Sequence, residues 1–189
     1  MGKDKIRTFI AFEFSHKNKE SLFSTYSTII PNIKLKWVPQ ENLHCTLAFL
    51  GLITEEQVKN IKEILSQLEI PSYPPNIKIN RLSAFPSLSR IRVLWLGPDK
   101  TPDWCKKIYK QLTTHLKKAK ISFDQKPNFV FHITIARTKN PLSPKEKEII
   151  YKITQHLPIT ISLKSITLFK SQLSSSHPIY SPIFQRSLD

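Results

Sequence analysis

Apolar residues recur at every second position, or in short unbroken runs, along much of this chain, as is typical of β-strands. The segments with this pattern are 6–14, 33–38, 44–51, 77–85, 90–97, 129–137, 159–169 and 179–184. Between them, other segments carry apolar residues three or four positions apart, which is the spacing of one helix face. We therefore predict an α+β protein in which amphipathic helices alternate with strands.

Four helices are expected between the strands, and three of them have a recognisable start. A helix over 16–30 has the weakest signal. The other three begin at side chains that can cap a first turn, namely Thr54 with Gln57, Thr101 with Pro102, and Ser143 with Pro144 and Glu146. These are the capping-box and proline signatures of helix N-termini.

One short motif occurs twice, each time inside a predicted apolar strand. His44 is followed two positions later by Thr46, and His132 is followed in the same way by Thr134, 88 positions further on. None of the other four histidines has this neighbour. A capped helix follows each motif strand. The repetition predicts two related α+β halves, and a pseudo-twofold arrangement would place the two motifs across a cleft.

In a strand, side chains two positions apart share a face. Each motif would therefore present one imidazole and one hydroxyl from an apolar scaffold, and three interpretations are open. A metal site needs further ligands, and no acidic residue or additional histidine lies at ligand spacing near either motif. Two structural histidines bonded to threonine are a second interpretation. The third is acid–base catalysis, in which one imidazole accepts a proton and the other donates one.

Arg137 and Phe49 each lie five positions after a motif histidine. A guanidinium can bind phosphate through two hydrogen bonds and stabilise added negative charge. By strict alternation, however, Arg137 lies on the face opposite to His132, and it can reach the same ligand only if the strand ends or bulges first. Phe49 could stack on a base, although such a residue more often belongs to the core.

The charge of the chain leaves two interpretations open. The chain has 29 Lys and Arg against 14 Asp and Glu, a net charge of +15, which either attracts a polyanion such as nucleic acid or only keeps the protein soluble, and charge alone does not decide between them. With 3 glycines in 189 residues, a phosphate-binding glycine loop is not expected. The 2 cysteines fit a reducing compartment, and no segment looks like a signal peptide or membrane span, so we expect a cytoplasmic protein.

The sequence resembles the two-histidine phosphoesterase superfamily and, within it, the RNA 2',3'-cyclic phosphodiesterases of the 2'-5' RNA ligase-like (LigT) type. The resemblance covers nearly the whole chain. It is carried by "RTFIAFEF", "WVPQENLHCTLAFLG", "VLWLG", "FVFHITIAR" and "LFKSQLSSSHPIYSPI". Two departures are the lack of a proline just before His132 and the presence of His177-Pro178 where the family often has glycine.

The resemblance implies one bilobal domain over 1–189, with two pseudo-symmetric halves of antiparallel sheet, helices packed outside, and the active site in a central cleft. It implies metal-independent opening of an RNA 2',3'-cyclic phosphate to a 2'-phosphate, without a cofactor. His44 would donate a proton and His132 accept one, while Thr46, Thr134 and Arg137 would bind phosphate.

The expected partners are RNA with cyclic phosphate ends, with tRNA fragments and small cyclic nucleotides as candidates, and we expect a monomer. Two other functions stay open. One is a non-catalytic RNA-binding module of the same fold, although intact histidines and threonines in both motifs argue against it. The other is 2'-5' ligation, the reverse reaction at the same site.

Overall fold

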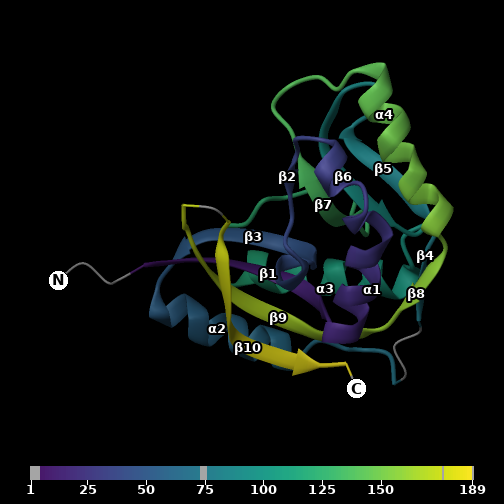
Figure 1. Ribbon diagram of the computed structural model, residues 1–189. Coiled ribbons are helices and arrows are strands. Elements are labelled where there is room, and N and C mark those ends of the chain that lie inside the picture. The colour runs from purple at the N-terminus through teal and green to yellow at the C-terminus, as the bar shows by residue number, and fades with distance from the viewer. Residues whose placement is uncertain (1–4, 73–75, 176, 189) are drawn as a thin grey trace.

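The computed structural model describes residues 5–72, 76–175 and 177–188, and its strands form three antiparallel sheets (Figure 1). The strands are β1 Ile6–Phe14, β2 Lys36–Trp37, β3 Cys45–Ile53, β4 Ile77–Ile79, β5 Arg81–Pro86, β6 Ile91–Gly97, β7 Ile133–Arg137, β8 Ile159–Ile161, β9 Leu163–Gln172 and β10 Ile179–Ser187. The α-helices are α1 His16–Ser27, α2 Glu55–Ser66, α3 Asp103–Lys118 and α4 Pro144–Tyr151. The predicted α+β class is confirmed.

The two motif strands belong to different sheets. One four-stranded sheet has the order β10-β9-β1-β3, and the other has the order β2-β7-β6-β5. The first carries α2 beside it, and α4 runs along the outside of the second (Figure 1). Short β4 and β8 form a separate two-stranded sheet. None of the helices in the described part of the chain is long and apolar enough to cross a membrane.

A single hydrophobic cluster runs through both halves. Phe12 of the first sheet and Phe131, next to β7, are both fully buried, with ring centroids 6.1 Å apart. Leu47 and Ile135, the apolar residues that follow the motif threonines, belong to the same cluster. Burial of this apolar surface is the main force that holds the sheets together. The motif strands are therefore fixed relative to one another by a shared core.

The capping predictions hold for two helices and fail for one. Thr54 and Ser143 each form the complete capping box with the glutamine or glutamate three residues later. Thr101 does not cap α3, because Pro102 is the N-cap residue and has no side-chain cap bond. The Thr101 hydroxyl instead accepts the Phe131 backbone N–H at 2.9 Å. This hydrogen bond holds the segment that leads into the second motif strand, β7.

Two predicted strands are each split in the structure. The segment 77–85 becomes β4 and β5, and 159–169 becomes β8 and β9, with the two parts of each in different sheets. Asn80 marks the first break, where its side chain accepts the Asp99 backbone N–H at 3.0 Å. At the first break the alternation of apolar residues changes phase, from Ile77 and Ile79 to Leu82 and Ala84, whereas it continues through the second break, which the pattern therefore could not reveal. The second motif strand is also shorter than predicted, beginning at Ile133.

Candidate active site

His44 and His132 occupy equivalent places, each one residue before its motif strand. His44 Nδ1 lies 2.7 Å from the carbonyl oxygen of Asn42, and His132 Nδ1 lies 2.8 Å from that of Val130. A carbonyl oxygen only accepts hydrogen bonds, so Nδ1 carries the hydrogen in both neutral rings. Each imidazole is thereby held by the residue two positions before it and keeps Nε2 free of a hydrogen.

The motif threonines lie beside these rings. Thr46 is buried, and its Oγ1 lies 3.0 Å from His44 Nε2. Thr134 is half-buried and lines two cavities together with Thr46. The intervening Cys45 and Ile133 are fully buried in the core. The prediction that histidine and threonine share one face, opposite the intervening residue, is confirmed in both copies.

Each motif strand contains a β-bulge at the residue after its threonine. The register of β3 with β1 skips Leu47, and the register of β7 with β6 skips Ile135. A bulge adds one residue to a strand and so reverses the alternation of side chains beyond it. Phe49 and Arg137 therefore return to the face of the threonines, and the condition under which Arg137 can reach the motif is met.

Two cavities meet at this shared face. The first, called the His44 cavity here, is also lined by Trp37, His177 and Tyr180. The second, the His132 cavity, is also lined by Phe85, Lys126 and Val130. The residues common to both cavities are Thr46, Phe49, Thr134 and Arg137. Two hydroxyls and a guanidinium thus lie between the two imidazoles, an arrangement suited to an anion held with one histidine on each side.

Aromatic rings support both histidines. The Phe9 ring lies 4.9 Å from His44, and Tyr180 meets the same imidazole edge-on at 5.4 Å. On the other side, Phe85 meets His132 edge-on at 5.0 Å. Sequence reasoning missed these three residues, because a strand pattern does not say which strands become neighbours. The rings limit the orientations of each imidazole and exclude water from its flanks.

Burial sets the charge state of the two rings. It lowers the pKa of both His44 and His132 from the ordinary value of 6.5 to about 4. The backbone carbonyls oppose this shift, whereas nearby positive charges add to it, Lys19 and Arg137 beside His44, and Lys126 and Arg137 beside His132. Both imidazoles are therefore neutral at pH 7 in the free protein, and a bound anion would raise both pKa values.

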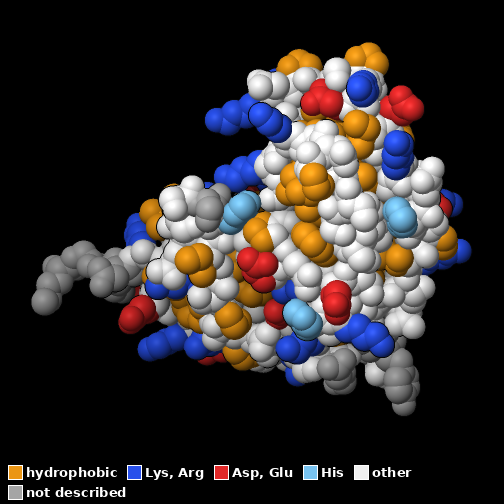
Figure 2. All heavy atoms as spheres, viewed as in Figure 1, with side chains coloured by type: hydrophobic (Ala, Val, Ile, Leu, Met, Phe, Trp, Pro, Cys, Tyr) orange, Lys and Arg blue, Asp and Glu red, His pale blue; other side chains and the backbone are white. Residues whose placement is uncertain are grey.

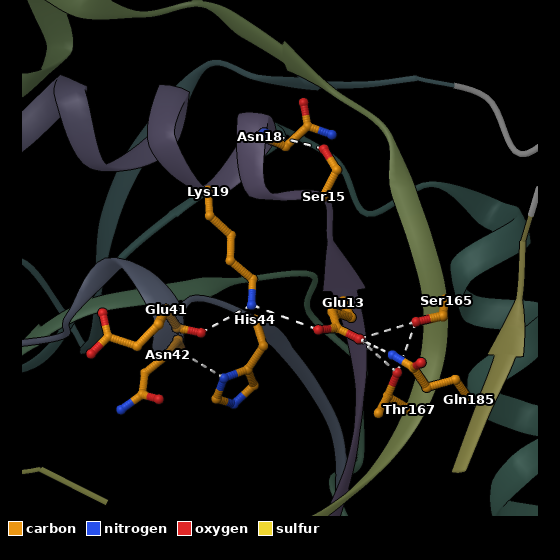
Figure 3. A network of polar contacts seen from close by, with 10 residues as sticks. All are labelled: Glu13, Ser15, Asn18, Lys19, Glu41, Asn42, His44, Ser165, Thr167 and Gln185. Carbon is orange, nitrogen blue, oxygen red and sulfur yellow. Dashed lines mark hydrogen bonds and ion pairs between the residues drawn. The ribbon is translucent and has the colours of Figure 1, made fainter. Parts of the chain in front are cut away.

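Lys19 belongs to a half-buried polar network next to His44 (Figure 3). Its ammonium donates to the Glu41 carbonyl oxygen at 2.9 Å and lies 3.7 Å from the Glu13 carboxylate. Glu13 also accepts hydrogen bonds from Thr167 at 3.0 Å and Gln185 at 2.7 Å. Burial lowers the pKa of Lys19, and the Glu13 carboxylate opposes that shift. The sequence offered no signal for this network, because its members come from helices and strands that are far apart in the sequence.

The described residues contain no group of three or more His, Cys, Asp or Glu side chains that could hold a metal ion. His177 lines the His44 cavity, but its Nε2 lies 3.1 Å from the Trp37 carbonyl oxygen and so bonds to the backbone. The donor set at the junction of the cavities is hydroxyl and guanidinium, which favours anions over cations.

Comparison with known proteins gives a consistent result. RNA 2',3'-cyclic phosphodiesterases from Thermotoga maritima and Aquifex aeolicus are 29% and 30% identical to this chain, over 95% and 94% of it and 94% and 95% of their own length. The crystal structure of Escherichia coli LigT complexed with 3'-AMP superposes with a TM-score of 0.76 over 97% of this chain and 98% of that one, at 20% identity. It shows the same fold.

The family's sequence pattern falls on the two halves of the chain. The sequence model of the LigT like phosphoesterase family matches residues 16–95 and 96–180, and each range contains one histidine-threonine motif. The two matched ranges agree with the predicted pair of related halves. With the paired motifs, the shared cavity face and this match over most of its length, the chain belongs to the LigT like phosphoesterase family.

Proposed function

We propose that this protein hydrolyses RNA 2',3'-cyclic phosphate ends to 2'-phosphates, with His44 and His132 as acid and base and without a metal. The observation that carries the proposal is the pair of identically held imidazoles on either side of Thr46, Thr134 and Arg137. The names of the Thermotoga and Aquifex relatives support the choice of an RNA cyclic phosphate as substrate.

The phosphate binds where the two cavities meet. Thr46 and Thr134 donate hydroxyl hydrogen bonds to its non-bridging oxygens, and Arg137 binds the same group through its guanidinium. Phe49, whose side chain is 43% exposed, stacks on the adjacent base. The negative charge of the phosphate raises the pKa of both histidines above about 4, so that one of them is protonated in the complex.

The reaction balances with two histidines and one water. Water attacks phosphorus on the side opposite the ribose 3'-oxygen, and the neutral His132 takes its proton at Nε2. The P–O3' bond breaks, and protonated His44 gives its Nε2 proton to the leaving oxygen. The donor and acceptor roles follow the family resemblance. Afterwards the two rings have exchanged charge states, and proton exchange with solvent resets them.

The test is incubation with an oligonucleotide that ends in a 2',3'-cyclic phosphate, with and without EDTA, followed by mapping of the product end. We expect a 2'-phosphate at an unchanged rate in EDTA. Loss of activity in EDTA that a divalent ion restores would disprove the metal-free mechanism. A 3'-phosphate product would disprove the direction of ring opening, and no turnover of any cyclic phosphate would disprove the function.

A further inference from the structure

A second hollow adjoins the His132 cavity and leads away from the candidate active site. Three consecutive residues, 126–128, line both of them. The hollow lies between α3 and the segment 123–129, and its wall includes Lys106, Lys110, Lys117, Phe123, Lys126 and Asn128. A shallower depression continues from Lys117 to Lys120. Together these surfaces form one path, called the α3 groove here, from the cavity to the end of α3.

The α3 groove has an excess of positive charge. The sequence from Asp103 to Asp124 contains six lysines, with one acidic residue at each end, and Asp103 pairs with Lys106 at 2.9 Å. Three of them, Lys106, Lys110 and Lys117, recur at helical spacing and so share one stripe of α3. At 1.5 Å per residue this stripe is about 16 Å long. By contrast, the face in Figure 2 carries acidic side chains among its basic ones.

The junction between the α3 groove and the cavity is held in place by α3 itself. The Tyr109 hydroxyl donates to the Lys126 carbonyl oxygen and accepts its backbone N–H, both at 3.3 Å. The Tyr109 ring also stacks on Phe129 at 4.8 Å. The Lys126 ammonium lies 5.9 Å from the centre of the Phe49 ring, which belongs to the shared face of the two cavities. Lys126 thus links the groove to the candidate phosphate site.

We propose that the α3 groove binds the single-stranded RNA that precedes the cyclic phosphate, an inference that rests on the proposed function. In the proposed reaction the ribose lies on the His44 side of the phosphate, so the nucleotide chain that precedes it passes Phe49 and Lys126 to enter the groove, with one phosphate per residue. The lysine stripe offers positive charges to these phosphates, and the partly exposed Phe123 offers a ring on which a base can stack. The substrate class is then an RNA oligomer several nucleotides long, bound more tightly than a cyclic mononucleotide.

The test compares two double variants of equal net charge. Lys110→Gln with Lys117→Gln removes charge from the groove. Lys107→Gln with Lys118→Gln removes the same charge from exposed positions of α3 outside it. The probe is a labelled hexanucleotide ending in a 2'-phosphate, which is not turned over, and fluorescence anisotropy gives its Kd at several salt concentrations. Circular dichroism verifies that both variants keep the wild-type fold.

We expect the groove variant to bind the hexanucleotide about tenfold more weakly at low salt. Its slope of log affinity against log salt should fall by about 1.4, since a single strand releases about 0.7 counterion per neutralised phosphate. The control variant should change the Kd less than twofold, and the mononucleotide 2'-phosphate should bind all three proteins equally. Equal losses in both variants, or displacement of the hexanucleotide by polyglutamate as readily as by unlabelled RNA, would overturn the proposal.

The outcome is separable from that of the proposed function. The binding assay needs no catalysis, so the groove is tested even if the protein turns over no cyclic phosphate. The converse result is also informative. If the wild-type protein hydrolyses a cyclic mononucleotide but the groove variant binds the hexanucleotide as tightly as the wild type, the RNA-binding role of the groove is disproved and the proposed active site is not.

Discussion

Each motif histidine has a backbone partner for Nδ1 and an Nε2 that carries no hydrogen in the neutral ring, which is the geometry expected of a group that transfers a proton. We predict that His44→Ala and His132→Ala each lower kcat by roughly 10²–10⁴, the usual contribution of one general acid or base. The double variant should lose less than the product of the two, because the groups act as a unit. Single-turnover kinetics measure this. Full activity in the folded single variants would show that both rings only pack.

The low pKa values of the two rings predict how activity and stability depend on pH. Free-enzyme pKa values near 4 govern kcat/KM, whereas the bound phosphate raises them in the complex that governs kcat. The optimum of kcat/KM should therefore lie at lower pH than that of kcat, and both profiles should be bell-shaped. Coincident optima would show that phosphate does not change the pKa of either ring.

The stability of the folded protein should also depend on pH through His44 and His132. Their pKa is about 4 when folded and near the ordinary 6.5 when unfolded, so the unfolded chain binds more protons between these values. Stability is then lost as the pH falls from about 6.5 to 4. We expect the Tm of the protein to fall over this window, and to fall less steeply in the double variant His44→Gln, His132→Gln. Equal slopes would contradict the assignment.

Substitution of Arg137 tests whether the bulge at Ile135 brings its guanidinium to the phosphate. Arg137→Lys keeps the charge but loses the planar fork that binds two phosphate oxygens at once. We predict a loss of at least tenfold in kcat/KM, with little change in Tm because the side chain is exposed. The matching control is Arg92→Lys, since Arg92 is exposed and bonds to the Lys139 carbonyl outside both cavities. An unaffected Arg137→Lys variant would place the guanidinium away from the phosphate.

At the scale of elements, periodicity predicted whether a segment is a helix or a strand, but not where a strand breaks or bulges. The capping box of α2 and the pairing of His44 with Thr46 followed from spacing alone, because local geometry decides them. The bulges at Leu47 and Ile135 did not, because they depend on the register with a neighbouring strand. For the same reason no pattern pointed to Tyr180, Phe85 or Lys126. These reach the site from other strands and loops, and only the assembled fold brings them there.

Thr54 and Thr101 both precede helices, but they have different roles. Thr54 caps its helix, whereas Thr101 bonds to the segment just before His132. Thr54→Ala removes the cap of α2 and should cost about 1 kcal/mol of stability without changing the rate. Thr101→Val leaves the Phe131 N–H without its acceptor, one residue before His132. We expect a similar loss of stability together with a lower kcat. Urea unfolding and steady-state kinetics on both variants decide the matter, and equal rates would show that Thr101 does not position His132.

At the scale of the whole molecule, the two halves each contribute one histidine but share one core. Phe12 and Phe131 touch across the boundary, and Cys45 lies close enough to His132 for the backbone there to affect the pKa of its thiol. The net charge of +15 is not spread evenly over the surface, since α3 carries five lysines and a single acidic residue, Asp103. Catalysis and RNA binding would thus depend on the same inter-half packing.

The continuous core predicts that the halves unfold together, in agreement with the proposed single bilobal domain over 1–189. A protein whose hydrophobic cluster crosses both sheets should show one calorimetric transition, with equal calorimetric and van't Hoff enthalpies. Substituting a cluster residue in either half, Leu47→Ala in the first or Ile135→Ala in the second, should lower the same Tm, because each removes buried contacts from the shared core. Both should also reduce activity, since each residue forms the bulge beside its threonine. Two separate transitions, each sensitive to only one of these variants, would show instead that the halves are independent domains with the site merely held between them.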